Sequence, residues 1–272
     1  MKISEYPAVT EFGVDDVFII DGTNGTKKIL ASDAIIAMLS MMSVKNKRLI
    51  FRGKNLGSSV TTEQKTAIQD GTFAGLSLGD YWEINGVNWR IADFDYWYNK
   101  GDTKFQTHHL VIIPDTPLST AQMNDTSDTT GGYTGSKMYT TTLTSIKSTI
   151  SSAFGDAVIT HREYLVNAIT SGYPSTGAWT DSSVELPNEI MIYGSYIYTP
   201  GNQGTTDVKR FTASNVQLAL FQVAPDLIAS GNGYWLRDVA SSTHFCRVDV
   251  TGAAQATGAA NNYGIRPVFP IG

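Results

Sequence analysis

The chain of 272 residues contains a single cysteine, Cys246. One cysteine cannot form an intrachain disulfide, and it excludes zinc sites built from several cysteines. Residues 1–7 lack the apolar core of a secretion signal, and no apolar run approaches the roughly 20 residues needed to span a bilayer. We therefore expect synthesis in a reducing cytoplasm and no membrane insertion. A final location outside the cell would require release as part of a particle.

Charged residues are also scarce, at 17% of the chain, and Thr, Ser, Gly and Asn supply most of the polarity. Hydroxyl residues and glycine suit turns and strand faces better than helices, which favours a β-rich body. Hydrophobic residues make up 42%, enough for a substantial core in one large domain with a small appendage. The net charge of −5 argues against nucleic acid as a partner.

The sequence offers no strong catalytic or metal-binding motif. His108 and His109 are neighbours and would point to opposite faces of a strand, so they cannot chelate one ion together. Several carboxylates could form the pair of a glycosidase, but only their separation in space would decide that. These are Glu83, Asp93, Asp95, Asp181, Glu185 and Glu189. We predict no catalytic residue, no metal and no cofactor.

Residues 1–45 look like a separate unit for anchoring and oligomerisation. Residues 14–20 and 27–30 are strand candidates around the turn at 21–25, and Ser32 or Asp33 can cap a following helix. The apolar face of that helix would hold Ile35, Ile36, Leu39 and Met42. Such a unit is too short to bury a core alone. It would dock on another chain or, alternatively, on its own C-terminal domain.

A connector over 46–74, with a short helix at 61–70, would lead to a body over 75–272. Asn85-Gly86 is typical of a two-residue hairpin turn between strands. In the rest of the body the patterns predict strands over 110–113 and 186–198, a loop over 123–135, and helices over 143–154 and 162–169.

The segment around Cys246 alternates cleanly. Cys246, Val248 and Val250 would share a buried face, and the cysteine would be an inert small hydrophobe. Phe245, Arg247 and Asp249 would share the other face, which is either a recognition surface or an ordinary solvated strand face.

Residues 233–269 are the most informative stretch. Both ends carry aromatic, β-branched and arginine residues suited to paired strands, and the middle is rich in Ala, Ser, Thr, Gly and Asn. This pattern indicates a rigid frame of paired strands that carries a surface whose residues can be replaced. Loops that a rigid frame presents commonly serve recognition.

Two motifs resemble those of a bacterial and phage domain family. Gly233-Tyr234-Trp235-Leu236-Arg237 is similar to its Trp-Leu-Arg-Ser type motif, and Gly264-Ile265-Arg266-Pro267-Val268-Phe269 to its Gly-Val-Arg-Pro-Ala-Phe type ending. The resemblance covers about 75–272 and implies a C-type-lectin-like fold. Relatives include formylglycine-generating enzymes and the variable proteins of diversity-generating retroelements. The enzymatic relatives need cysteine sites that a single cysteine cannot supply.

In the variable proteins, the segment before the Gly-x-Arg-Pro ending forms the ligand-binding face. The corresponding span here is 238–263, and with the strand before it we place the binding face in 234–263. The predicted contact residues are Tyr234, Arg237, Asp238, Ser241, Ser242, Thr243, His244, Arg247, Asp249, Asn261, Asn262 and Tyr263. The opening of the chain, through 15–20 and 26–29, is similar to the N-terminal piece of many phage structural proteins.

Together these resemblances imply a phage tail or baseplate protein in the virion that binds a bacterial surface protein or glycan without chemistry. Its N-terminal region would contact other tail proteins, and it would form a homo-oligomer, a trimer by analogy with phage fibres. Two alternatives remain: a virion-associated wall or glycan hydrolase, and a purely structural virion protein.

Overall fold

The computed structural model describes residues 16–22, 25–31, 34, 38, 42–199 and 216–272. Helices and strands follow one another throughout these residues, so the expected α+β class is confirmed. None of the described helices has the length and apolar character that crossing a bilayer requires.

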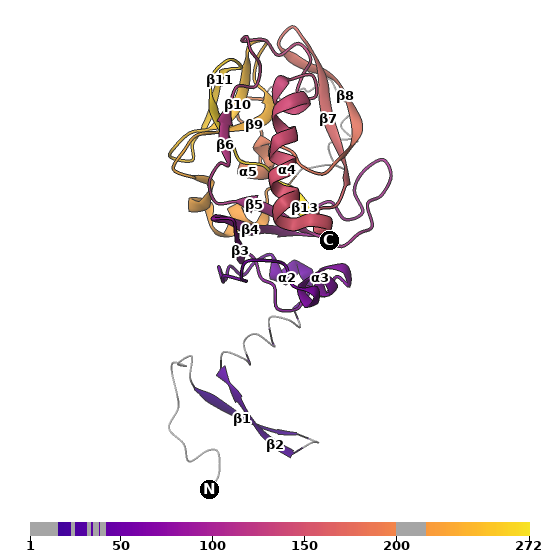
Figure 1. Ribbon diagram of the computed structural model, residues 1–272, viewed down its shortest axis with the longest axis vertical. Coiled ribbons are helices and arrows are strands. Elements are labelled where there is room, and N and C mark those ends of the chain that lie inside the picture. The colour runs from indigo at the N-terminus through magenta and orange to yellow at the C-terminus, as the bar shows by residue number, and fades with distance from the viewer. Residues whose placement is uncertain (1–15, 23–24, 32–33, 35–37, 39–41, 200–215) are drawn as a thin grey trace.

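The N-terminal region contains an antiparallel hairpin of β1 (Val17–Gly22) and β2 (Gly25–Leu30), in which Val17 pairs with Leu30. The two predicted strands are thereby confirmed. Figure 1 shows this hairpin apart from the body that holds all elements from α2 (Val44–Lys47) onward. The predicted helix with Ile35, Ile36 and Leu39 lies outside the described residues.

The first sheet of the body has the strand order β13-β5-β4-β3. Its strands are β3 (Tyr81–Ile84), β4 (Val87–Phe94), β5 (Leu110–Pro114) and β13 (Phe269–Ile271). Asn85 and Gly86 form the turn between β3 and β4 with φ of 54° and 75°, as the Asn-Gly pair predicts. Every residue of β5 is buried, which explains its uninterrupted apolar sequence.

Helix α4 (Leu143–Phe154) covers part of this sheet, and its prediction is confirmed. Its buried residues are Leu143, Ile146, Ile150 and Phe154, the spacing of one helix face. The ring of Phe154 lies 5.6 Å from that of Trp89 and 5.3 Å from that of Phe269. This aromatic group joins the helix to β4 and to the C-terminal strand.

The second sheet has the order β11-β10-β9-β12-β6. Its strands are β6 (Ser119–Ala121), β9 (Tyr234–Val239), β10 (His244–Val248), β11 (Ala254–Gly258) and β12 (Tyr263–Ile265). β9 pairs antiparallel with β10 and parallel with β12, so it lies inside the sheet. The polar segment of the C-terminal region is therefore largely strand.

A long two-stranded ribbon is formed by β7 (His161–Thr170) and β8 (Tyr173–Ser182). The predicted helix over 162–169 is wrong. Leu165 and Ile169 are four residues apart, a spacing that places two side chains on one face of a helix and also on one face of a strand. Pairing with β8 decides between the two, which the local pattern could not do.

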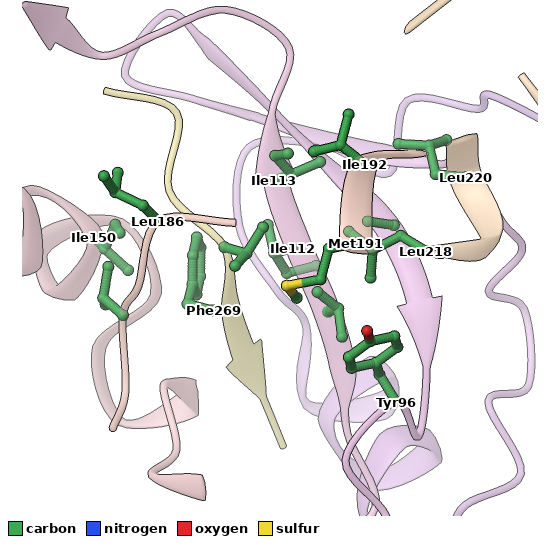
Figure 2. Packing of buried hydrophobic residues seen from close by; sticks show 14 of the residues in the cluster. Tyr96, Ile112, Ile113, Ile150, Leu186, Met191, Ile192, Leu218, Leu220 and Phe269 are labelled. Carbon is green, nitrogen blue, oxygen red and sulfur yellow. The ribbon is translucent and has the colours of Figure 1, made fainter. Parts of the chain in front are cut away.

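The predicted strand over 186–198 is also wrong, because this segment contains α5 (Glu189–Tyr193). Asn188 caps the helix by accepting a hydrogen bond from the Met191 amide at 2.7 Å, and Gly194 ends it with φ of 79°. Figure 2 shows Met191 beside Leu218 and Ile112 of β5. Leu218 immediately precedes α7 (Ala219–Val223), which the 3₁₀ turn Pro225–Ile228 follows.

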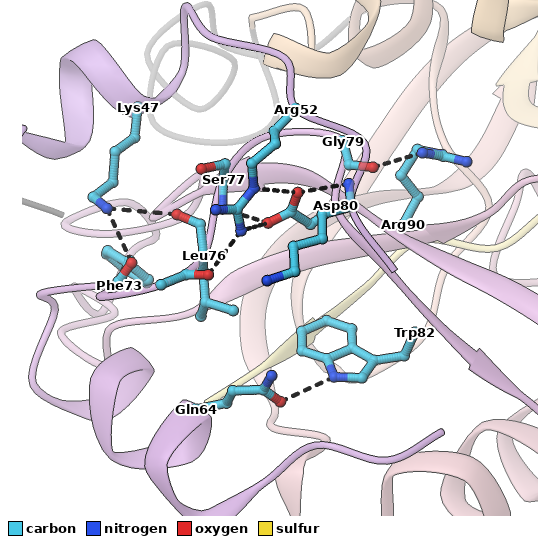
Figure 3. A network of polar contacts seen from close by, with 12 residues as sticks. Lys47, Arg52, Gln64, Phe73, Leu76, Ser77, Gly79, Asp80, Trp82 and Arg90 are labelled. Carbon is cyan, nitrogen blue, oxygen red and sulfur yellow. Dashed lines mark hydrogen bonds and ion pairs between the residues drawn. The ribbon is translucent and has the colours of Figure 1, made fainter. Parts of the chain in front are cut away.

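The sequence predicts a connector over 46–74. In the structure, residues 44–80 pack closely on the rest of the body. The helix α3 (Thr62–Gln69) starts at a capping box formed by Thr61 and Gln64, and its residue Ile68 belongs to the core. Asp80 is buried and accepts hydrogen bonds from Arg52 and from the amides of Lys54 and Ser77 (Figure 3). We call this region, together with β3, the proximal end.

Candidate ligand-binding surface

Two of the predicted contact residues, Tyr234 and Arg237, are buried, and their assignment to the binding surface is corrected here. Both lie on β9, which other strands flank on its two edges. The Tyr234 side chain is 0% exposed, and its hydroxyl donates to the Ile228 carbonyl at 3.0 Å. Arg237 is 7% exposed, and its Nη2 lies 3.3 Å from Glu163 Oε2. Both side chains hold the frame together and are inaccessible to a large ligand.

Arg237 belongs to a buried polar layer between β9 and the β7–β8 ribbon. Glu163 Oε2 also accepts a hydrogen bond from Trp97 Nε1 at 3.0 Å, and the His161 ring lies 3.9 Å from the Trp97 ring. Burial lowers the pKa of His161, which keeps its imidazole neutral. This layer ties the ribbon to the second sheet.

The arginine of the Gly-x-Arg-Pro motif is structural too. Arg266 is 1% exposed, and it donates to the carbonyls of Pro114, Leu227 and Ile228 at 2.9 to 3.2 Å. The guanidinium also lies 5.1 Å from the centre of the Tyr234 ring. A single buried cation thus binds carbonyl groups of two segments that are far apart in sequence. This explains why the motif belongs to the rigid frame.

The expected alternation around Cys246 holds only in part. Cys246 and Val248 are buried, and burial raises the pKa of the cysteine thiol, as an inert residue requires. Phe245 was expected to face solvent and is completely buried, whereas Val250 was expected to be buried and is 58% exposed. Val250 lies beyond the end of β10, and the pairing of β10 with β9 changes register between Phe245 and Arg247. Alternation alone could not foresee either change.

Arg247 and Tyr263 form a half-buried pair on the second sheet. The Arg247 guanidinium lies 4.3 Å from the centre of the Tyr263 ring, and its Nε donates to Thr257 Oγ1 at 2.8 Å. Tyr263 in turn packs edge-on against Trp235, with 5.1 Å between ring centres. The cation is therefore held over an aromatic ring and can present its remaining N–H groups to an acceptor.

The predicted residues 241–244 form the turn between β9 and β10. Ser241 Oγ and Thr243 Oγ1 lie 3.2 Å and 2.7 Å from His244 Nδ1, and the amides of Ala240 and Ser241 donate to the His244 carbonyl. Ser242 is exposed at the tip of this turn. The turn is held by its own short side chains and leaves Ser242 open to solvent.

Two further loops lie against the turn between β9 and β10. Thr129 Oγ1 donates to the Ser241 carbonyl at 2.8 Å, and the Thr129 amide donates to the Ser242 carbonyl at 3.2 Å. A side chain added at Gly172, in the β7–β8 turn, would meet the Ser242 amide nitrogen at 3.2 Å. We call residues 125–130, 171–173, 241–244 and 261–262 the distal loop surface. Figure 1 shows the ribbon and β10–β11 at the end of the body opposite α2 and α3.

The distal loop surface contains hydroxyl, amide, glycine and aspartate residues and His244, but no lysine or arginine. Asn261 and Asn262 are exposed, and the Asn261 amide Nδ2 donates to the Gly258 carbonyl at 2.9 Å. Tyr173 is 54% exposed and supplies a large aromatic side chain. Tyrosine among Ser, Asn and Gly is the composition of antibody paratopes, in which rigid aromatics provide contact area and small polar groups adapt.

Two predicted polar contacts have structural partners. The Asp249 carboxylate accepts hydrogen bonds from Thr251 and the Ala253 amide, and these bonds lower the pKa of Asp249. Asp238 Oδ2 accepts from the Glu189 amide at 2.5 Å. The first carboxylate shapes the turn after β10, and the second joins β9 to the start of α5.

Sequence reasoning missed residues 125–130 and 171–173. The first belongs to the predicted loop over 123–135, but nothing local indicates what it touches. The second was hidden by the wrong helix over 162–169. Ser171-Gly172, with φ of 54° and 80°, is a hairpin turn that the Gly could have signalled.

The candidate hydrolase carboxylates are mostly engaged in the structure. Asp93, Glu185 and Glu189 are buried, and Glu189 accepts hydrogen bonds from the amides of Ile197, Tyr198 and Thr199. Asp95 bonds to His108 Nδ1 at 2.8 Å and to the His109 amide at 3.0 Å, a proximity that the sequence did not reveal. Among the described residues, no group of three or more His, Cys, Asp or Glu could hold a metal ion.

No family model, no curated protein and no solved structure matches this chain.

Proposed function

We propose that this protein is a receptor-binding component of a phage tail or baseplate. Its C-type-lectin-like body would bind a bacterial surface protein or glycan through the distal loop surface and the Arg247–Tyr263 pair. One observation carries the proposal: segments far apart in sequence meet through Thr129, Ser241 and Gly172 at the end of the body away from α2 and α3. Adaptable loops on a rigid frame are the usual construction of a recognition site.

Binding without chemistry is favoured over hydrolysis because the candidate carboxylates are mostly bound to other groups of the protein. A glycosidase needs two carboxyl groups that face one substrate. Here the buried Asp93 is bound to Arg48, and Glu189 is occupied by three backbone amides. The distal loop surface contributes Asp125, which pairs with Lys137, and Asp128, which bonds to Thr130.

The N-terminal region would join copies of the chain and attach them to other tail proteins. A two-stranded hairpin such as β1–β2 is marginally stable by itself in water, so a partner surface would stabilise it. A homotrimer would also hold several weak binding surfaces together and raise the overall affinity.

The test is binding of the labelled full chain to a panel of whole bacterial cells, purified capsule and purified peptidoglycan. Ser242→Arg places a long cation at the exposed centre of the distal loop surface and should abolish binding. Ser59→Arg is the matched control, because Ser59 is also an exposed serine and lies outside that surface. Both variants should fold like the parent.

The outcomes separate the functions considered. Loss of binding in Ser242→Arg alone supports the proposal. Release of soluble fragments from capsule or peptidoglycan would indicate a hydrolase, and absence of binding to every envelope would indicate a structural virion protein.

The oligomer is tested separately by light scattering on the full chain and on a fragment that begins at Ser43. The fragment keeps α2 because Lys47 is buried against the body, where its Nζ donates to the Phe73 carbonyl at 3.0 Å. A trimeric full chain and a monomeric fragment are expected. A monomeric full chain contradicts the anchoring role.

A further inference from the structure

A pocket of about 220 Å³ opens at the proximal end of the body. Its lining comes from two segments that are far apart in sequence: Lys45, Arg48 and Leu49 around α2, and Val216 and Gln222 around α7. The described residues of the lining include two cations and no carboxylate, in a protein whose net charge is −5.

The two walls of this pocket are cross-linked by the buried carboxylate of Asp93. Arg48 binds Asp93 through two nitrogens, with Nε 2.7 Å from Oδ1 and Nη2 2.8 Å from Oδ2. The Ala219 amide, at the start of α7, donates to Oδ2 at 3.1 Å. Tyr96 attaches the second wall to the body, because its hydroxyl donates to the Val216 carbonyl at 2.6 Å. These bonds hold Arg48 and the start of α7 in place, which lowers the entropy lost when a ligand binds to Arg48.

The cationic groups of the lining keep unused hydrogen-bond donors. Arg48 Nη1 and Lys45 Nζ have no hydrogen bond or ion pair with any residue that the structure describes. Asp93 balances the charge of Arg48, so Lys45 gives the described lining a net positive charge. Gln222 adds a side-chain amide whose nitrogen donates to the Gln217 carbonyl, and Leu49 and Val216 add apolar surface.

We propose that this pocket binds a small oxyanion, a phosphate or a carboxylate group, with Arg48 Nη1 and Lys45 Nζ as its donors. Arginine and lysine donors form charge-assisted hydrogen bonds to such oxygens, and a pocket of this size suits one small group rather than a drug-sized ligand. Leu49 and Val216 would contact the carbon atoms next to a carboxylate. This inference does not depend on the attachment role of the distal loop surface.

The experiment is a titration of the isotope-labelled full chain with inorganic phosphate and, separately, with succinate. Chloride keeps the ionic strength constant, and backbone amide signals are followed by NMR. Saturable shifts are expected at residues 45–49 and 216–222. Lys45→Ala should weaken binding about tenfold, because it removes one hydrogen bond to a charged group. Gln222→Glu places a carboxylate in the lining and should weaken binding as well.

Lys54→Ala is the matched control, because Lys54 is an exposed lysine outside the pocket. It should leave both titrations unchanged. Saturation by phosphate alone supports a phosphoryl ligand, and saturation by succinate alone supports a carboxylate ligand. Shifts that do not saturate, or that are equal in the parent and in Lys45→Ala, overturn the proposal.

Discussion

The two ends of the body are built with different chemistry. At the proximal end, Arg52 pairs with Asp80 and Arg48 with Asp93, and both carboxylates are buried. At the distal end, short hydroxyl and amide side chains hold the turns, and no lysine or arginine is present in the distal loop surface. The difference indicates which end is fixed and which can vary.

The two ends differ in this way because their side chains have different numbers of hydrogen-bond partners. Asp80 accepts hydrogen bonds from Arg52 and from the amides of Lys54 and Ser77, so its loss would leave several donors unpaired. Ser242 and Asn262 are exposed, and a change there disturbs little else. A recognition surface can change its residues only where the frame does not depend on them.

The largest expected effect is that of Asp80→Ala at the proximal end. Removing one partner of a buried ion pair should lower the free energy of unfolding by about 3 kcal/mol. Urea unfolding of the full chain measures this loss. The control is Asp125→Ala, which breaks the exposed pair with Lys137 at the distal end and should cost under about 1 kcal/mol. Equal losses at both ends would contradict the comparison.

The next expected effect is a pH dependence of stability caused by two buried histidines, His109 and His161. Burial lowers the pKa of His109 to about 3, and burial also lowers the pKa of His161. Below an unfolded-state pKa of about 6.5, the unfolded chain binds protons that the folded chain does not. Stability is therefore present above about pH 6.5 and falls on acidification by about 1.4 kcal/mol per pH unit for His109, and the lowered pKa of His161 acts in the same direction.

Urea unfolding between about pH 6.5 and pH 5 measures this slope, before most carboxylates titrate. His109→Gln should flatten it. A slope that His109→Gln leaves unaltered would show that the buried imidazole is not responsible.

A smaller effect is expected for Thr129→Val, which removes the hydroxyl that donates to the Ser241 carbonyl. The loss of this buried hydrogen bond should cost about 1 kcal/mol and should reduce binding to cells by loosening the distal loop surface. Thr126→Val, at an exposed position of the same loop, is the control for both measurements. Unchanged stability in Thr129→Val would mean that the loops do not support one another.

The smallest effect on stability is expected for Arg247→Ala, at about 0.5 to 1 kcal/mol, because a partly exposed cation–π contact is lost. If Arg247 contacts the receptor, Arg247→Ala should bind cells much less than the parent does while it loses only this small part of the free energy of unfolding. Lys147→Ala is the control, since the Lys147 amine lies 5.7 Å from the centre of the Tyr139 ring, away from the distal loop surface. Normal binding by Arg247→Ala would limit the proposed site to the loops.

Local signals in the sequence determined several elements. Asn85-Gly86 specified a hairpin because Asn and Gly accept positive φ, and the spacing of Leu143, Ile146, Ile150 and Phe154 specified a helix with one buried face. The alternating motif around Cys246 indicated a strand, and the Gly-x-Arg-Pro ending indicated a frame. These features depend on neighbours within a few residues.

Only the tertiary structure decided what the side chains do. The spacing of Leu165 and Ile169 fits helix or strand, and pairing with β8 chose the strand. Tyr234 and Arg237 look like contact residues in sequence, yet neighbouring elements bury both. The meeting of Thr129, Gly172 and Ser242 and the bridge that Asp93 makes between Arg48 and Ala219 join distant segments. Burial and long-range hydrogen bonds depend on how these segments pack, and no local pattern records that packing.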